Sequence, residues 1–384
     1  MERRQRLAIF LSGLICLSTI SPSCATYLPD FGGDGRNGNK TIAGVVTEVA
    51  TIPANFRQIL VQNGSTWSVV SGQMLKSNTT TIGQGASGSL IVLKGFKGGE
   101  RGDSYSDGFG LGYGPSGGGA MATNGGGGGG GCGGKGGNGA NLFSATGQTG
   151  AKGGREIPFH VNMAGSSGAG GTSITSGTGT RGGDGGGRLT IMSRKSITIA
   201  AGASISAPGG NGENAPGPSV NCAGGGGGSG GVIVLASTVS VVNSGTISLN
   251  GGNGGNGSGT PGGGGGGGGG IALFFAPTIT TGTIIATGGS VGTGGNTAGT
   301  AGSAGISVSV IGIPTDPLLS WVQTNIERLA HDPQAKRGRL VMRAVSLAIM
   351  AAGGDWRRVA TLMGADGMSC EAIGDQVKLG DNVA

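Results

Sequence analysis

Charged and aromatic residues are scarce in this chain. Of its 384 residues, 11% are charged and 4% are aromatic. The low charge argues against the charge-rich composition of most disordered chains, and a formal net charge of +7 over this length gives no reason to expect nucleic-acid binding. The few aromatic residues exclude a core built from large rings. The apolar residues are mostly Val, Ile, Leu and Ala, so we expect a thin core built from β-branched side chains rather than large rings.

Histidines and clustered acids are also in short supply. The two histidines, His160 and His331, are far apart in the sequence, which leaves little for a metal site or a Ser-His-Asp triad. Between residues 150 and 313 the acids are Glu156, Asp184 and Glu213, and none falls on a strand of the repeat described below. We therefore predict no catalytic residues, no metal site, no cofactor and a protein that is not an enzyme.

The first 25 residues have the pattern of a secretory signal peptide. Three arginines precede an apolar run from Leu7 to Ile20, and small residues follow it. The run is shorter than the roughly 20 residues that span a bilayer, so we predict no integral membrane span. Cleavage after Ala25 fits the small-residue rule, and lipid anchoring at Cys24 is the alternative. We predict a secreted or cell-surface protein.

Glycine is what the chain has in excess. There are 94 glycines, nine of them consecutive in "PGGGGGGGGG" at 261–270, and "GGKGGNG" (133–139) and "GGNGGNG" (251–257) show a three-residue rhythm. Three residues per turn is the repeat of polyproline II, which makes no internal hydrogen bonds. Such glycine tracts can instead hydrogen-bond to one another at close range. We predict a packed bundle with every third residue pointing outward; flexible glycine loops between strands are the alternative.

Three segments repeat with a period of roughly 40 residues. They are "GGGRLTIMSRKSITIAAGASISAPGGNG", "GSGGVIVLASTVSVVNSGTISLNGGNG" and "GGGGIALFFAPTITTGTIIATGGSVG", in which we align Leu189, Val232 and Ile271. Apolar and hydroxyl residues alternate along their strands. The expected apolar stacks are Ile197 with Val239 and Ile279, and Ile205 with Ile247 and Ile284. Because one unit cannot bury its apolar face alone, this pattern predicts an all-β repeat of the β-solenoid type, with polyproline-II-like glycine segments.

Composition divides the chain into five parts. After Pro314 it changes sharply, and Leu318, Val322, Ile326 and Leu329 then recur at helical spacing. The expected parts are a signal peptide (1–25), an N-terminal β cap (26–100), a glycine-rich segment (101–181), β-solenoid repeats with glycine-rich excursions (182–313) and a small all-α C-terminal domain (314–384).

Two further features suggest sites. Cys132 and Cys222 both stand beside poly-glycine tracts, at what look like comparable places in two segments. In an oxidising compartment they could form a disulfide, and two buried thiols are the alternative. Arg101, Gly102 and Asp103 match a short cell-attachment motif that integrins read, although three residues in a glycine-rich chain also arise by coincidence.

The repeat "GGGGGSGGVIVLASTVSVVNSGTISLNGGNGGNG" resembles glycine-rich β-solenoid proteins of bacterial surfaces and phage tails. Its glycine tracts resemble the polyglycine-II sandwiches of T-even-type phage receptor-binding adhesins, and the resemblance extends from about Phe31 to Ile313. It implies recognition of a cell-surface ligand by exposed loops and supplies no catalytic residues. The signal peptide departs from the phage proteins, which are assembled in the cytoplasm, and favours a bacterial surface protein.

Two functions of different class follow from the sequence. The first is a secreted, non-enzymatic structural protein or adhesin that binds a cell-surface glycan, another surface polymer or a protein receptor, with self-assembly as a further option. The second is a polysaccharide-active parallel β-helix enzyme, which would need two carboxylates close together in one groove.

Overall fold

The computed structural model of the chain describes residues 35–52, 55–85, 87–101, 112–114, 116–119, 125–140, 151–154, 164–172, 179–217, 222–258, 261–294 and 299–311. These residues belong to the second of two compact units, Asp30–Ile313. The expected signal peptide and the expected C-terminal helices lie outside the described residues.

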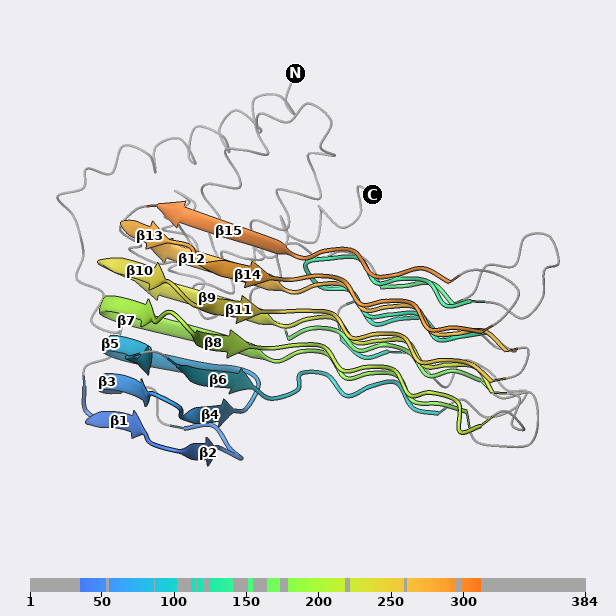
Figure 1. Cartoon of the computed structure of the whole chain (residues 1–384), viewed down its shortest axis with the longest axis horizontal. Helices are drawn as coiled ribbons and strands as arrows, with labels where there is room; N and C mark the ends of the chain where they lie inside the picture. Colours follow the sequence, from blue (N-terminus) through green and yellow to red (C-terminus); the bar gives the residue numbers. More distant parts are fainter. Residues whose placement is uncertain are drawn as a thin grey trace, which may run out of the picture. The chain divides into compact units, whose positions relative to one another are not determined.

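The described chain forms two sheets in which every strand pair is parallel (Figure 1). The first sheet contains, in spatial order, β1 (Asn39–Ile42), β3 (Asn55–Gln62), β5 (Gln73–Gln84), β7 (Arg188–Ile199), β9 (Val232–Ser237), β12 (Ile271–Ala276) and β15 (Ile306–Ile311), with β10 (Ser240–Asn243) and β13 (Thr278–Thr280) beside them. The second contains β14 (Thr283–Ile285), β11 (Thr246–Ser248), β8 (Ala203–Ser206), β6 (Gly88–Val92), β4 (Thr66–Val69) and β2 (Val45–Thr47).

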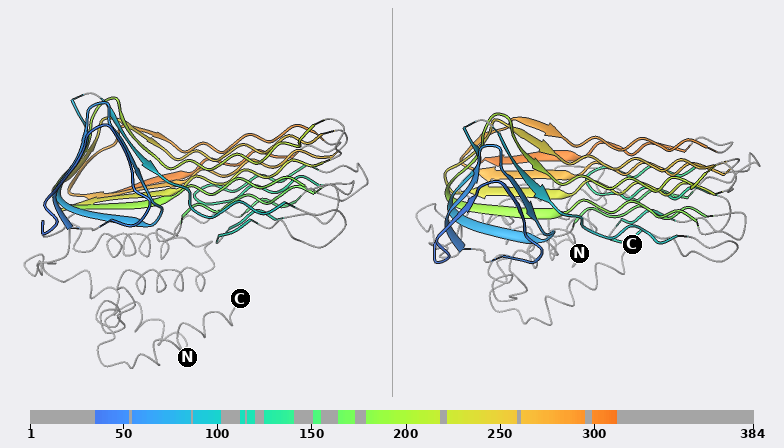
Figure 2. Two further views of the ribbon diagram at one scale, coloured as in Figure 1. Left: turned by 90° about the horizontal axis from the view of Figure 1, so that it is seen from below. Right: turned by 60° about the horizontal axis from the view of Figure 1, so that its bottom comes forward.

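The chain alternates between these sheets, so each turn of chain stacks on the one before it. This is a β-solenoid-like arrangement, and the predicted all-β class is confirmed for the residues described, which contain no helix. The strands of the expected N-terminal cap continue the same two sheets, because β5 pairs with β7 and β6 pairs with β8. Figure 2 shows the three-sided outline of the stacked coils.

Apolar side chains stack in columns inside the coils. Register places Leu75, Ile191, Leu235 and Phe274 in one column on the first sheet, and all four are fully buried. The second sheet carries the column Trp67, Leu90, Ile205, Ile247 and Ile284. The predicted stack of Ile205, Ile247 and Ile284 is therefore confirmed. Each buried side chain of this size contributes about 1.5 to 3 kcal/mol, so the narrow core depends on repetition along the stack.

Two sequence alignments were wrong in register. Ile197 pairs with Val241 rather than Val239, and Val232 pairs with Arg188 rather than Leu189. The first error arises at a corner, where Ser237 accepts hydrogen bonds from the backbone N–H groups of Val239 and Ser240. Paired residues are 44 apart on both sides of this corner, since Ser193 pairs with Ser237 and Ser196 pairs with Ser240. Val239 lies at the corner itself and is 52% exposed.

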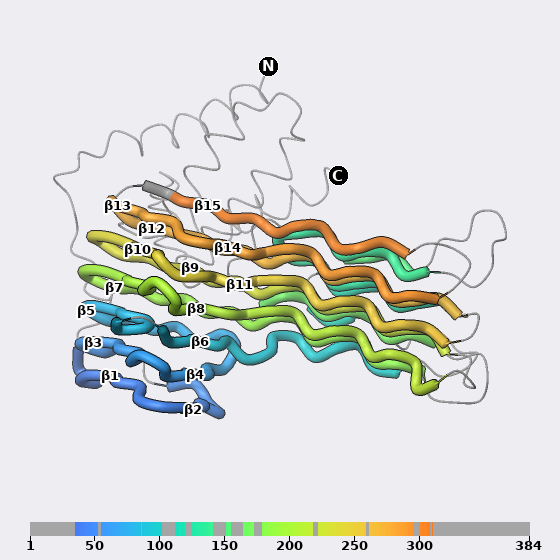
Figure 3. The backbone as a smooth tube through the Cα atoms, in the orientation of Figure 1, coloured from blue at the N-terminus to red at the C-terminus, as the bar shows by residue number. Residues whose placement is uncertain are grey.

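The glycine-rich segments extend from the sheets as long tracts that lie side by side (Figure 3). Four outward tracts follow strands of the second sheet, and four inward tracts lead into strands of the first. The outward tracts are 93–101, 207–217, 249–258 and 286–294, and the inward tracts are 179–187, 222–231, 261–270 and 299–305. The segment between β6 and β7 adds inserted tracts at 112–119, 125–131, 133–140, 151–154 and 164–172.

Hydrogen bonding between tracts follows a three-residue cycle. From Gly224 to Ser229, successive N–H groups donate to tracts 261–270, 207–217 and 164–172 and then repeat that order. The carbonyl groups of the same residues accept in turn from tracts 125–131, 249–258 and 179–187. Tract 222–231 is thus surrounded on all sides by backbone, and its buried polar groups are satisfied without any regular sheet.

The nine-glycine run, Gly262–Gly270, is surrounded in the same way. From Gly264 onward it donates to tracts 249–258, 125–131 and 299–305, and up to Gly269 it accepts from tracts 222–231, 133–140 and 286–294. A Cβ added at Gly264, Gly265 or Gly266 would meet a carbonyl oxygen of a different neighbouring tract each time, at well under 3.0 Å. No direction around this tract has room for a side chain, which is why its glycines are uninterrupted.

Candidate functional site

Tracts on the surface of the bundle carry a polar residue at every third position. Asn253, Asn256 and Lys135 are exposed, as the three-residue rhythm predicts, and Asn138 is half-buried. At these positions the backbone N–H that points outward has no backbone carbonyl to bond. A side-chain oxygen of the adjacent tract accepts its hydrogen bond instead. Asn253 Oδ1 accepts from Ser290 N at 2.9 Å, and Asn256 Oδ1 accepts from Thr293 N at 2.9 Å.

The same arrangement recurs around the bundle. Asn211 Oδ1 accepts from Asn253 N, and Asn214 Oδ1 accepts from Asn256 N, both at 2.8 Å. On another edge, Ser303 Oγ accepts from Lys135 N at 2.6 Å. These amides and hydroxyls therefore complete the hydrogen bonding of the bundle surface, and their presence alone does not indicate a ligand site.

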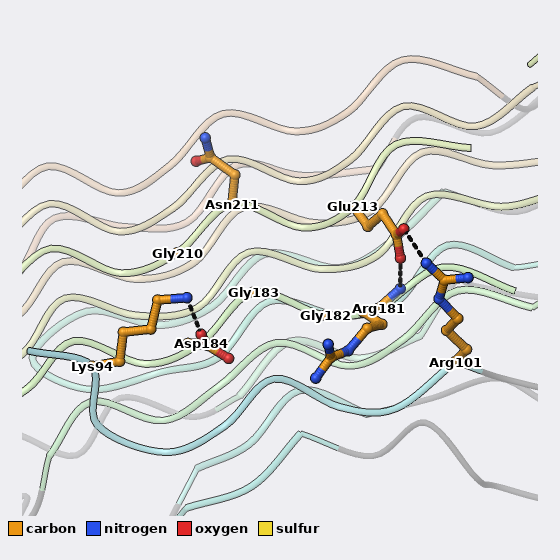
Figure 4. Close-up of a pocket in the computed structure, with 9 residues that line it drawn as sticks. All are labelled: Lys94, Arg101, Arg181, Gly182, Gly183, Asp184, Gly210, Asn211 and Glu213. Carbon is orange, nitrogen blue, oxygen red and sulfur yellow. Dashed lines mark hydrogen bonds and ion pairs between the residues drawn. The ribbon is translucent and has the colours of Figure 1, made fainter. Parts of the chain in front are cut away.

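A charged trough interrupts this surface (Figure 4). Its floor is the inward tract 179–187, and its walls are the outward tracts 93–101 and 207–217. The volume is about 360 Å³. The side chains that line it are Lys94, Arg101, Arg181, Asp184, Asn211 and Glu213.

Both carboxylates of the trough bond to backbone as well as to a cation. Asp184 Oδ1 accepts from Gly98 N at 2.6 Å, and Asp184 Oδ2 pairs with the Lys94 ammonium. Glu213 Oε2 accepts from Arg181 N at 2.8 Å, and its other oxygen pairs with the Arg101 guanidinium. Burial by itself would raise the pKa of Asp184, but the bonds from Lys94 and Gly98 outweigh it and hold that pKa below its ordinary value.

The Arg181 guanidinium differs from the other two cations. Its backbone N–H bonds to Glu213, while its side chain points away from Glu213 (Figure 4). Among the described residues, no ion pair within 4.0 Å is formed by this guanidinium, although its charge helps to lower the pKa of Asp184. The trough thus has three cations and two carboxylates, with one exposed cation not engaged in a direct pair.

The structure places only part of the expected attachment motif. Arg101 lies in the trough and pairs with Glu213, whereas Gly102 and Asp103 lie outside the described residues. The Arg101 guanidinium therefore already has an acid partner within the bundle.

Cys132 and Cys222 are buried thiols that are not joined by a disulfide. Gly127 N bonds to Gly224 O, and Gly130 N bonds to Gly227 O, so their two tracts run in the same direction. Cys132 follows its tract and Cys222 precedes its own, which offsets them by about seven residues, or roughly 20 Å at about 3.1 Å per residue. A disulfide requires Cα atoms within about 7 Å. The disulfide prediction overlooked this reversal, and the alternative of two buried thiols agrees with the structure.

We expect both thiols to resist alkylation until the bundle unfolds. Burial raises the pKa of Cys132 to about 12 and raises the pKa of Cys222 as well, the latter with help from the Glu213 charge. Mass spectrometry after iodoacetamide treatment should show both cysteines unmodified in the native protein and both modified in denaturant without reductant. Rapid labelling of the native protein would contradict the burial of the thiols. Modification in denaturant only after addition of reductant would show that the two cysteines form a disulfide.

The sequence contained a signal for the trough that we did not use. Arg181 and Asp184 are three residues apart, as Lys135 and Asn138 are, which is the spacing of outward positions. Neither Asp184 nor Glu213 falls on a strand, so the strand pattern does not predict that they share a site. They meet through the packing of glycine tracts, whose neighbours the sequence does not specify.

Comparison with known proteins supplies no family for this chain. It matches no protein-family model, no curated protein sequence and no solved structure. Within the part of the chain that the structure describes, no group of three His, Cys, Asp or Glu side chains could hold a metal ion. Nor do the described residues include a helix long and apolar enough to cross a membrane.

Proposed function

We propose that the chain is a secreted, non-enzymatic surface protein that binds a cell-surface glycan or other polymer, built as a β-solenoid continued by a polyglycine-II bundle. The observation that carries this proposal is the three-residue cycle of hydrogen bonds along Gly224–Ser229. It is the pattern expected when three-fold glycine helices pack in a hexagonal array. Such a bundle is rigid, and its interior carries no functional side chains.

A rigid bundle suits adhesion because it holds the ends of its tracts in fixed positions. Three of the four outward tracts end at Gly217, Ser258 and Gly294, at the end of the bundle far from the sheets (Figure 1). Their ends lie together, since Ser258 N bonds to Cys222 O and Gly263 N bonds to Gly294 O. The described ends of these tracts therefore lie at one end of the bundle, and the connections 218–221, 259–260 and 295–298 follow them in the sequence.

The test replaces these three connections together with Gly-Ser sequences of equal length. We expect the full chain to bind components of a glycan array, the replaced chain to lose that binding, and the thermal unfolding of the two to agree. A matched control replaces residues 49–51, which are exposed between β2 and β3 in the solenoid, and should bind as the wild type does. Unchanged binding after the triple replacement would contradict recognition by the connections, and no array binding by the wild type would contradict glycan adhesion.

Polysaccharide cleavage is a second candidate, favoured by one observation. Asp184 and Glu213 line the same trough, and a glycoside hydrolase needs two carboxyl groups across one groove. However, such an enzyme also needs one carboxyl with a raised pKa, whereas the pKa of Asp184 is lowered and both acids are held by cations and backbone N–H groups. Release of reducing ends from polygalacturonate by the wild type, but not by Asp184→Asn, would establish the enzyme and refute our proposal.

A further inference from the structure

The trough on the side of the bundle has the width of a single extended chain. The inward tract 179–187 forms its floor and is bonded on one side to tract 93–101 and on the other to tract 207–217. In a complete array a further tract would lie over Arg181–Asp184. Instead, the Asp184 and Glu213 carboxylates accept the bonds of Gly98 N and Arg181 N, as carbonyl groups of that tract would.

Charge along the trough is arranged at two positions. Lys94 and Asp184 form one, and Arg101, Arg181 and Glu213 form the other, three residues further along the floor tract (Figure 4). Each position combines a cation with a carboxylate. The cation can bind an anionic group of a ligand, and the carboxylate can accept hydrogen bonds from the ligand's hydroxyl groups. Asn211 is exposed on one wall, and because its Oδ1 already accepts from Asn253 N, its amide NH2 group is the part that can donate to a ligand.

These features restrict the chemistry of a ligand. Its shape must be linear, because the trough follows the tracts. A polymer with a negative charge on every unit and no other polar group would be repelled by Asp184 and Glu213. A chain that carries hydroxyl groups between its carboxylates matches both kinds of group. Arg181 is suited to the carboxylate itself, since a guanidinium binds a carboxylate through two parallel hydrogen bonds.

We propose that this trough binds one extended chain of a uronic-acid polysaccharide, with Arg181 as the residue that binds a carboxylate of the polymer. The site is separate from the connections at the end of the bundle. It would therefore bind its ligand whether or not those connections do, and the two proposals fail independently.

The experiment titrates polygalacturonate into the full-length protein and measures affinity by isothermal titration calorimetry. Replacement of Arg181 by glutamine should weaken binding by roughly ten- to a hundredfold, the range for loss of one charge-assisted pair. The backbone N–H of Arg181 keeps its bond to Glu213 in this variant, so unfolding should be unchanged. Lys135→Gln is the matched control, because Lys135 is an exposed cation at an outward position on another edge. It should bind as the wild type does.

Several results would overturn the proposal. Absence of binding by the wild type would do so, as would equal losses in Arg181→Gln and Lys135→Gln, which indicate a general basic surface. Equal affinity for neutral dextran would show that the carboxylate is not recognised, and equal affinity for single-stranded DNA would show simple attraction of polyanions. Replacement of the three connections should leave polygalacturonate binding intact. Loss of polygalacturonate binding in that variant would place the ligand at the end of the bundle rather than in the trough.

Discussion

Replacing Gly266 with alanine is expected to destabilise the protein by about 3 kcal/mol or more. The added Cβ would lie well under 3.0 Å from Gly289 O, a backbone atom that cannot rotate away. Relief requires the two tracts to separate, and that movement breaks bonds on both sides, since Gly266 N bonds to Thr300 O and Gly266 O accepts from Gly137 N. Urea unfolding followed by circular dichroism gives the change in free energy, and limited proteolysis should cleave the variant within the bundle.

The matched control is Gly119→Ala, in an inserted tract of the same bundle. Its added Cβ would lie 3.1 Å from the nearest atom, Lys152 O, so the neighbouring tract needs to move by only a few tenths of an ångström. We expect less than about 1 kcal/mol, because alanine also lowers the entropy of the unfolded chain. Equal stability of the two variants would mean that the nine-glycine run is not packed, and flexible glycine loops would then be the correct interpretation.

This contrast shows how much of the bundle could be read from the sequence. The rhythm of "GGNGGNG" predicts a surface tract, because only one position in three has room for a side chain. The uninterrupted run 262–270 marks a tract enclosed by others, although we did not draw that distinction from the sequence. Glycine tracts carry no pattern that identifies their neighbours. The meeting of Asp184 with Lys94 and of Glu213 with Arg101 therefore could not be predicted.

The solenoid was more readable, because its side chains alternate. Ile205, Ile247 and Ile284 stack as expected, since the glycine corner before each strand keeps the three segments aligned. On the first sheet the expected alignment was wrong by two residues, because Val239 lies in the turn at Ser237 and Val241 holds the buried position. A pattern with period two does not reveal a shift by two, because the same face remains apolar.

The remaining large effect is expected for Phe274→Ala, at about 3 to 5 kcal/mol. Phe274 is fully buried on β12 and stacks on Leu235, so its removal leaves a cavity that the stacked strands cannot close. Val239→Ala is the control, because Val239 is 52% exposed, and we expect a change within about 0.5 kcal/mol. Urea unfolding of both variants measures the difference, and a similar small change in each would contradict the buried column.

The same variant tests whether solenoid and bundle unfold together. Phe274 lies four residues after the end of the nine-glycine run, and Ile271 N bonds to Gly231 O at the point where the tracts become strands. In stacked structures each repeat is stabilised by its neighbours, so a loss in one part lowers the stability of adjacent parts. Hydrogen exchange of the amides of Gly262–Gly270 should therefore become faster in Phe274→Ala. If their protection is unchanged, the bundle is stable by its own backbone hydrogen bonds, and the solenoid serves only as its base.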